Sequence, residues 1–217
     1  MQRRLRNPAT QVSPLMDQKR QSKMEGMTKE GEEKMRKVVA SPFTSLDGLM
    51  SGPQGEIEWN MPYFDEEMAS FVKEILEGLD TLLFGRVTYE WFAQFWPNEG
   101  VKQDPDHAGL MNSLPKIVFS KTLEKAEWNN SRIVRDNVVE EVNRLKQQEG
   151  KNMVIDGSPT LIHSFTSLGL IDEFLIRLHP VTLGSGVPLF EQAVKLSLLE
   201  ARPLRSGVVI LRYQVLK

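Results

Sequence analysis

Residues 155–190 read IDGSPTLIHSFTSLGLIDEFLIRLHPVTLGSGVPLF. This stretch places a glycine turn at the start of a helix, and a long apolar strand and a second glycine turn follow the helix. A helix that begins directly after a buried strand presents its free backbone amides at the edge of a sheet. We therefore predict a phosphate-binding edge on an α/β sheet.

The segments around this stretch support the same fold class. Short apolar runs alternate with helical periods from residue 35 onward, which is typical of a sheet buried on both faces. The pattern predicts strands at residues 37–43, 81–84, 116–120, 132–135, 152–155, 173–181 and 207–216. It predicts helices at residues 64–76, 88–95, 137–148 and 159–168. We expect the last two strands to be antiparallel neighbours.

Composition limits the class of protein. The chain of 217 residues is long enough for one domain, and its net charge of −2 gives no general attraction to nucleic acid or anionic membranes. The absence of cysteine excludes disulfides, thiolate catalysis and cysteine-based zinc sites. Since no long apolar run or signal-peptide core is present, we expect a cytoplasmic protein.

The first 34 residues differ from the rest of the chain. They contain no aromatic residue, and they hold eight Lys or Arg residues against five Asp or Glu residues. Such a segment buries too little apolar surface to offset its ordering entropy. We predict a disordered extension at 1–34, or alternatively a short partner-binding helix, and one folded domain at 35–217.

The turn Asp156-Gly157-Ser158-Pro159 carries the first candidate site. Gly157 allows close approach of a ligand to the backbone, Ser158 suits the N-cap, and Pro159 suits the first helical turn. The exposed amides would attract an anion such as a pyrophosphate. The alternative is a tight strand-to-helix turn without a ligand.

A second candidate site lies at the ends of other strands. Gly85 ends a buried strand, Arg86 can pair with a phosphate, and Thr88 can cap the next helix. Ser120-Lys121 ends another strand, and Arg135 ends the next one. These charges converge if the strands share one edge, whereas the alternative for Arg86 is a surface ion pair.

A third candidate is the glycine-bearing loop that begins with Ser45-Leu46-Asp47-Gly48, upstream of Trp59. A mobile loop between the first strand and the first long helix would suit a lid over a cofactor. Asp-Gly is also a common turn pair, and turn chemistry alone is the alternative.

These motifs together resemble the dihydrofolate reductase-like superfamily. The resemblance rests on SLDG at 45–48, LLFGRVTYE at 82–90, KIVFSKTL at 116–123, DGSPTLI at 156–162 and GLIDEFLIRLHPVTLGSGVPLF at 169–190. It covers essentially all of 35–217 and is closest to the riboflavin-biosynthesis reductase (RibD C-terminal) domain and its stand-alone bacterial relatives.

The resemblance implies both a fold and an activity. The fold is a three-layer α/β/α arrangement around a mixed, mostly parallel sheet with an antiparallel C-terminal strand. The activity is hydride transfer from NADPH to a small, heterocyclic or related substrate. A homodimer is also implied, and its seam is expected along residues 183–188 and the strand that begins at Glu173.

The resemblance also assigns residues to the cofactor. It places the adenine-side phosphates, the pyrophosphate and the nicotinamide along the strand ends. The cofactor-binding residues that it implies are Gly85, Arg86, Thr88, Ser120 and Lys121 for the adenine side, Gly157, Ser158, Thr160 and Leu161 for the pyrophosphate, and Thr44 and Ser45 for the nicotinamide. Asp156 stands where the family often has glycine, so an acidic side chain is expected near the pyrophosphate.

On the substrate side, Trp59-Asn60-Met61-Pro62 resembles the stretch before the substrate helix of the folate enzyme. The position of that enzyme's acidic residue falls on Phe64, and Asp65 is one residue further on, so dihydrofolate itself is not the expected substrate. Asp47 and Asp65 are the candidate proton donors, with Tyr63 or water as substitutes. Trp59 and Phe64 are candidate stacking surfaces for a flat ring, and core packing is their alternative.

Two further functions stay open. The first is the riboflavin-pathway reduction of 5-amino-6-(5-phosphoribosylamino)uracil, which needs a second anion site. The second is a non-catalytic protein that binds or senses NADPH. No metal is expected, because Asp104, Asp106 and His107 lack further histidines at ligand spacing and are predicted to lie in a solvent-facing loop.

Overall fold

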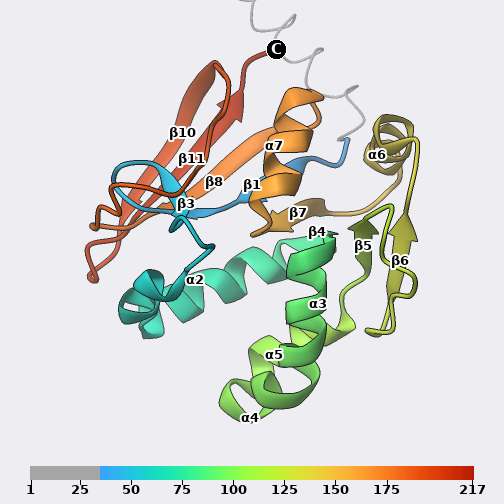
Figure 1. The fold of residues 1–217 in the computed structure, drawn as a ribbon, viewed down its shortest axis with the longest axis horizontal. Coiled ribbons are helices and arrows are strands. Elements are labelled where there is room, and N and C mark those ends of the chain that lie inside the picture. Colours follow the sequence, from blue (N-terminus) through green and yellow to red (C-terminus); the bar gives the residue numbers. More distant parts are fainter. Residues whose placement is uncertain (1–34) are drawn as a thin grey trace, which may run out of the picture. The chain divides into compact units, whose positions relative to one another are not determined.

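The structure is a computed structural model that describes residues 35–217. The predicted extension at 1–34 lies outside these described residues. Residues 36–217 form one compact unit, in which a central sheet separates two layers of helices (Figure 1). Helices α6 and α7 cover one face, and α2, α3 and α5 cover the other, so the predicted three-layer α/β/α fold is confirmed.

Most elements lie within a few residues of their predicted positions. The strands are β1 (Val38–Ser41), β2 (Phe43–Thr44), β3 (Leu49–Ser51), β4 (Leu79–Gly85), β5 (Lys116–Phe119), β6 (Ser131–Val134), β7 (Asn152–Asp156), β8 (Glu173–Leu178), β9 (Val187–Pro188), β10 (Leu196–Pro203) and β11 (Val209–Val215). The helices are η1 (Glu58–Tyr63), α2 (Glu66–Glu77), α3 (Arg86–Phe95), η2 (Trp96–Gly100), α4 (Val101–Gln103), α5 (Pro105–Ser113), α6 (Val138–Lys146) and α7 (Pro159–Ser167).

The main sheet has the order β10-β11-β8-β1-β7-β4-β5-β6. Strand β2 follows β1 in the chain and also pairs with β8. The six strands from β8 to β6 are parallel. Strand β11 runs antiparallel to both β8 and β10, which confirms the expected antiparallel pair. A small separate sheet joins β3 to β9.

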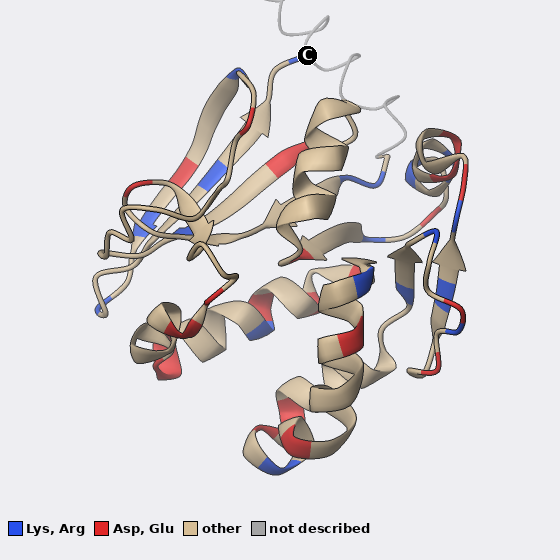
Figure 2. Cartoon of the chain, viewed as in Figure 1, with Lys and Arg blue, Asp and Glu red and all other residues tan. Residues whose placement is uncertain are grey.

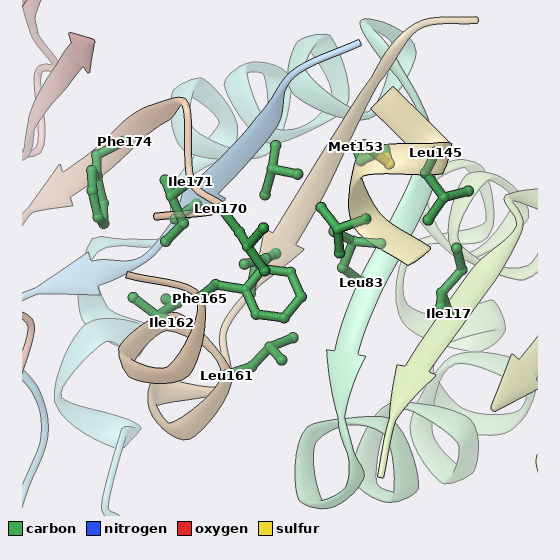
Figure 3. Close-up of a cluster of buried hydrophobic side chains, with 14 of the residues drawn as sticks. Leu83, Ile117, Leu145, Met153, Leu161, Ile162, Phe165, Leu170, Ile171 and Phe174 are labelled. Atoms are coloured by element: carbon green, nitrogen blue, oxygen red, sulfur yellow. The ribbon is translucent and has the colours of Figure 1, made fainter. Parts of the chain in front are cut away.

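Alternating side chains fill the two sides of the sheet, as the period of a strand requires. Leu83 and Met153 face α6 and α7, whereas Leu82 and Val154 face α2 and α3. Figure 3 shows Phe165 of α7 among the side chains that fill the first side. Both faces are therefore buried, which explains the continuous apolar strands in the sequence.

The start of α3 differs from the prediction. Thr88 does not cap this helix, because α3 begins at Arg86 and its N-cap is Gly85. The strand therefore passes directly into the helix, without an intervening loop. In contrast, α2 is capped as a polar N-cap residue predicts, since the Asp65 side chain accepts a hydrogen bond from the Met68 amide at 2.9 Å.

Two other expectations are wrong in detail. His107 lies in helix α5 and is buried against Trp96, with ring centroids 4.4 Å apart, instead of facing solvent in a loop. The strand from Glu173 is not an exposed seam, because β8 has β11 on one side and β1 on the other. The loop after Ser45 contains strand β3, which pairs with β9, and its role as a lid stays a prediction.

Candidate active site

The candidate cofactor crevice lies at the carboxyl ends of β4 and β7. The chain leaves β4 through α3 toward β5, and it leaves β7 through α7 toward β8, so the two connections run in opposite directions over opposite faces. Open α/β sheets bind ligands outside the strand ends at such a switch point. The adjacent β4 and β7, with Leu83 opposite Ile155, therefore place the predicted turns at one edge.

The two predicted turns lie against each other. A Cβ atom added to Gly85 would lie 2.5 Å from Ser158 Oγ and 3.8 Å from Leu161 Cβ. A Cβ atom on Gly157 would lie 3.6 Å from Thr88 Cγ2. Gly85 thus allows the start of α3 to approach Ser158 at the start of α7, whereas the position of Gly157 has room for a side chain.

Both helices begin without a side-chain cap. Within residues 35–217, no side chain accepts a hydrogen bond from the first-turn amides of α3 or α7. Gly157 and Ser158 have φ values of 71° and 66°, so two successive residues adopt the left-handed conformation before α7. Uncapped amides at two neighbouring helix starts form a place for an anionic group.

Basic side chains surround the β4 side of the crevice. Figure 2 shows Lys and Arg at the start of α3 and along the loops after β5 and β6. Arg86 is half-exposed, and its Nη1 lies 3.5 Å from Glu90 Oε2. Lys121 is exposed and lies 3.9 Å from Asp136. These loose ion pairs leave both cations accessible to a phosphate.

Some predicted cofactor residues serve the fold. Leu161 is buried in the core, and its amide donates to the Ser158 carbonyl at 3.0 Å, so neither group is free for a ligand. The Ser120 hydroxyl accepts from the Leu123 amide at 2.9 Å and forms part of a turn. Thr160 is exposed in the first turn of α7 and faces no such restriction.

Asp156 has a partner that the sequence does not reveal. Its Oδ1 lies 3.0 Å from Arg177 Nη2, and that same nitrogen donates to the Ser41 carbonyl. The guanidinium comes from β8, whereas Asp156 ends β7, so this ion pair spans β1 between them. The acidic side chain beside the anion site is therefore compensated by a buried cation.

Several hydrogen bonds hold the loop that contains Asp47. Thr44 and Ser45 are buried, and Ser45 Oγ donates to Asp47 Oδ1 at 2.5 Å. Asp47 also accepts from the amides of Leu183, at 3.2 Å, and Gly184, at 2.8 Å. The Ser45 hydroxyl and then the Gly184 amide lower the pKa of Asp47 to about 2. A carboxylate that is ionised at neutral pH cannot donate a proton, so Asp47 does not suit the predicted acid role.

A small aromatic pocket lies beside this loop, at the ends of β2 and β8, and its volume of about 10 Å³ leaves room for no more than one water molecule. Its lining residues are Phe43, Asn60, Tyr63, Phe64, Met68, Arg177 and His179. Trp59 packs edge-on against Phe43 and His179, with ring centroids 5.6 and 5.3 Å away, and Tyr63 lies 5.5 Å from His179. The predicted substrate residues Trp59 and Phe64 thus belong to one aromatic group with His179.

Asp65, the other predicted acid, is exposed at the rim of this pocket. Its carboxylate caps α2, and this bond holds it away from the pocket lining. Its role as proton donor stays a prediction. Tyr63 and water are the alternatives that reach the pocket directly.

Three wider hollows lie elsewhere on the surface. One lies between α3 and the loop at 123–129, one between α2 and β11, and one at the amino ends of β4 and β5. None of them includes the uncapped helix starts. Across residues 35–217, no group of three or more His, Asp or Glu side chains is placed to hold a metal ion. Within the same range, no helix is long and apolar enough to cross a bilayer.

Comparison with known proteins agrees with this geometry. The family called RibD C-terminal domain matches residues 36–210, which is most of the chain. The chain belongs to the RibD C-terminal domain family. The sequence resemblance to riboflavin-biosynthesis reductases is thereby confirmed, and so is the α/β fold with its mixed, mostly parallel sheet.

Individual members and structural neighbours of the RibD C-terminal domain family extend the match. The uncharacterized protein YyaP of Bacillus subtilis (strain 168) is 36% identical over 184 residues, covering 83% of this chain and 95% of YyaP. The crystal structure of a putative riboflavin biosynthesis protein from Shewanella sp. PV-4 has a TM-score of 0.66 and 24% identity, over 83% of this chain and 99% of that one.

Dihydrofolate reductase from Enterococcus faecalis, solved in complex with NADP(H), shares the fold with a lower TM-score and a lower identity. Its TM-score is 0.56 and its identity 18%, over 83% of this chain and 97% of that one. This chain therefore has a dihydrofolate reductase-like fold, as the motifs predict.

The sequence alone does not predict two residues of the candidate site. Neither His179 nor Arg177 receives a functional role from the sequence. The signal for Arg177 is its position, because arginine is rarely fully buried and here interrupts an apolar strand. A buried cation in such a strand needs a partner, and Asp156 supplies it.

Proposed function

We propose that this protein is an NADPH-dependent reductase that transfers hydride to a small substrate. The observation that carries the proposal is the pair of uncapped helix starts, α3 and α7, which meet at the switch point beside Arg86. The amides suit a pyrophosphate, and Arg86 and Lys121 suit the 2′-phosphate that distinguishes NADPH from NADH. When bound, NADPH would supply the hydride.

The protein would contribute position and shape to the reaction. Thr44 and Ser45 follow Phe43 in the chain, and pairing with β8 and a hydrogen bond to Asp47 hold them in place. Phe43, Trp59 and Tyr63 pack edge-on around His179 and would form one wall of the substrate site. The proton that completes reduction would come from Asp65, Tyr63 or water, since hydrogen bonds from the Ser45 hydroxyl and the Gly184 amide lower the pKa of Asp47.

The Arg86→Ala variant tests this proposal. We expect it to weaken NADPH binding about tenfold and to leave NADH binding unchanged, because a half-exposed guanidinium contributes on the order of 1 kcal/mol to a phosphate contact. Titration calorimetry with both cofactors gives the two affinities. Arg132→Ala is the matched control, since Arg132 is equally exposed and pairs with a glutamate, but lies in β6 outside the crevice. Equal affinity of the wild type for NADPH and NADH would contradict the proposal.

Family membership also favours the riboflavin-pathway reduction as a candidate reaction. Following NADPH absorbance with 5-amino-6-(5-phosphoribosylamino)uracil, dihydrofolate and simple carbonyl compounds would separate the candidates. Tight NADPH binding without turnover of any substrate in a broad panel would favour the sensing protein instead. The cytoplasmic location stays a prediction, which cell fractionation would check.

We also propose that two copies pair along β10. This eight-residue strand forms the outer edge of the sheet, and Leu198 and Leu199 are 54% and 49% exposed on it. A long edge strand with exposed leucines favours pairing with a second sheet. Light scattering should give the mass of a homodimer, and Leu198→Lys should shift it to that of the monomer. A wild-type monomer would contradict this proposal.

A further inference from the structure

A cleft lies at the opposite end of the sheet from the candidate cofactor crevice. It has a volume of about 280 Å³ between helix α2 and strands β8, β10 and β11, and we call it the α2 cleft. Strands β4, β7 and β8 begin beside it, whereas the crevice lies at the carboxyl ends of β4 and β7. Small-molecule sites of this size take small ligands that are largely covered by the protein. The α2 cleft is therefore large enough for a ligand of its own.

The base of the α2 cleft is apolar and incompletely covered. Val39 of β1, Ile75 of α2 and Leu175 of β8 line it, and they pack against the core but remain partly exposed. Strands β1 and β8 lie in the interior of the sheet, where a helix normally covers both faces. A ligand with an apolar body would remove this surface from water, which favours binding.

Two arginines on neighbouring strands line the α2 cleft. Arg202 of β10 lies opposite Ile210 of β11, and Arg212 is two residues further along β11. Since side chains two residues apart on a strand share a face, both arginines lie on the face where Ile210 packs into the core beneath α2. The side chain of each arginine is 42% exposed, so both guanidinium groups are accessible to a ligand.

Glu173 holds one of these arginines in place. Its carboxylate is 1% exposed, and it accepts a hydrogen bond from Arg212 Nε at 2.8 Å and another from Lys37 Nζ at 2.6 Å. Both oxygens of the buried acid are therefore paired with cations. Among residues 35–217, no group accepts a hydrogen bond from the Nη atoms of Arg212. These two nitrogens can bind a ligand carboxylate in the bidentate manner.

Acidic side chains limit the charge that a ligand can carry. Glu74 Oε2 lies 3.6 Å from Arg202 Nη1, which is too long for a hydrogen bond, and Glu200 stands opposite Arg212. Both acids line the α2 cleft and are exposed. One carboxylate can displace the loose contact of Glu74, whereas a doubly charged phosphate would be repelled by both acids. Paired hydrogen bonds, and not net charge, would hold the ligand.

We propose that the α2 cleft is a second binding site, which takes a small monocarboxylate with an apolar body. The ligand carboxylate accepts hydrogen bonds from the guanidinium groups of Arg202 and Arg212. The apolar body covers Val39, Ile75 and Leu175. The site is separate from the cofactor crevice, so the inference goes beyond the proposed reductase function and does not depend on NADPH binding.

Probes that share one ring system but differ in charge test the ligand class in the full-length protein by NMR titration. They are 2-naphthoate, a monocarboxylate, 2-naphthamide, its neutral isostere, 2-naphthyl phosphate, a dianion, and 2-naphthylmethylammonium, a cation. We expect 2-naphthoate to bind at least about tenfold more tightly than each of the others. No binding of 2-naphthoate, or equal or tighter binding of another probe, would overturn the inference.

Variants then assign the contacts. Arg212→Lys keeps a charge beside Glu173 but removes the planar fork, and it should weaken 2-naphthoate binding about fivefold. Arg202→Met should weaken it about threefold and leave 2-naphthamide binding unchanged. The matched control is Arg205→Met, because Arg205 also pairs with a glutamate, Glu67, but lies outside the α2 cleft. Unchanged 2-naphthoate binding in both cleft variants would refute the site, and thermal unfolding of each variant establishes that its fold is intact.

Methyl NMR signals of the wild type locate the bound probe directly. The naphthalene ring of 2-naphthoate should shift the methyl signals of Val39, Ile75 and Leu175, whereas those of Leu161 at the start of α7 should not move. Arg86→Ala, which alters the cofactor crevice, should leave 2-naphthoate affinity unchanged. Shifts at Leu161 in place of the three cleft residues, or loss of 2-naphthoate binding in Arg86→Ala, would place the probe in the crevice and refute the second site.

Discussion

The Gly186→Ala variant is expected to lose about 4 kcal/mol of unfolding free energy and to melt roughly 10 °C below the wild type. Gly186 has a φ of 150°, and a Cβ atom there would lie 1.9 Å from the Ser51 carbonyl oxygen. The obstructing atom belongs to the backbone, so no side-chain rotation relieves the contact. The two strands of the small sheet, β3 and β9, would have to separate.

Separation of β3 and β9 would also disturb the candidate site. Strands β3 and β9 connect the Asp47 loop to residues 183–188, and the Leu189 amide donates to the Gly48 carbonyl at 2.9 Å. Loss of these contacts would release the backbone next to Ser45. We therefore expect weaker cofactor binding in addition to lower stability.

Thermal and urea unfolding, followed by circular dichroism, measure the effect. Gly184→Ala in the same turn is the matched control, because Gly184 has a φ of 75° and nothing lies within 4 Å of its Cβ position. That control should lose only about 1 kcal/mol from the left-handed backbone. Equal losses in the two variants would show that the close approach to Ser51 contributes nothing.

The parts of the fold that the sequence predicts are those with a strong local signal. Continuous apolar strands and amphipathic helices identify the parallel sheet, and Gly157-Ser158-Pro159 identifies the start of α7. Strand β10 is missed because its side chains face solvent and leave no alternating apolar pattern. Helix α5 is missed because one of its three buried residues is the polar His107, and because Pro105 and Gly109 weaken the helical signal.

In the candidate site, too, the sequence predicts the residues that have a strong local signal. Glycines and basic residues at strand ends are visible in the sequence, and the parallel sheet brings them to one edge. The contact between Asp156 and Arg177 joins residues on β7 and β8, with β1 between them. Because that pairing depends on strand order, which no local pattern encodes, Asp156 is predicted only as an unexplained acid beside the pyrophosphate.

The ion pair between Asp156 and Arg177 leads to the second large effect. Arg177→Met should lower the unfolding free energy by about 3 kcal/mol, because it leaves a mostly buried carboxylate and the Ser41 carbonyl without their donor. Adding Asp156→Asn removes the unpaired charge, so the double variant should regain about 2 kcal/mol. Arg202→Met, which removes a half-exposed arginine on β10, should cost less than about 1 kcal/mol.

Cofactor affinity should follow the charge of this pair independently of stability. The unpaired Asp156 of Arg177→Met lies beside the free amides of α7, so it would repel a pyrophosphate and weaken NADPH binding about tenfold. Asp156→Asn alone leaves the Arg177 cation uncompensated and should strengthen NADPH binding, while the double variant should return near the wild type. Calorimetry at low and high salt measures all three, and the differences should shrink as salt screens the charges. If both single variants change NADPH affinity in the same direction, Asp156 and Arg177 act on the cofactor through the fold and not through their charges.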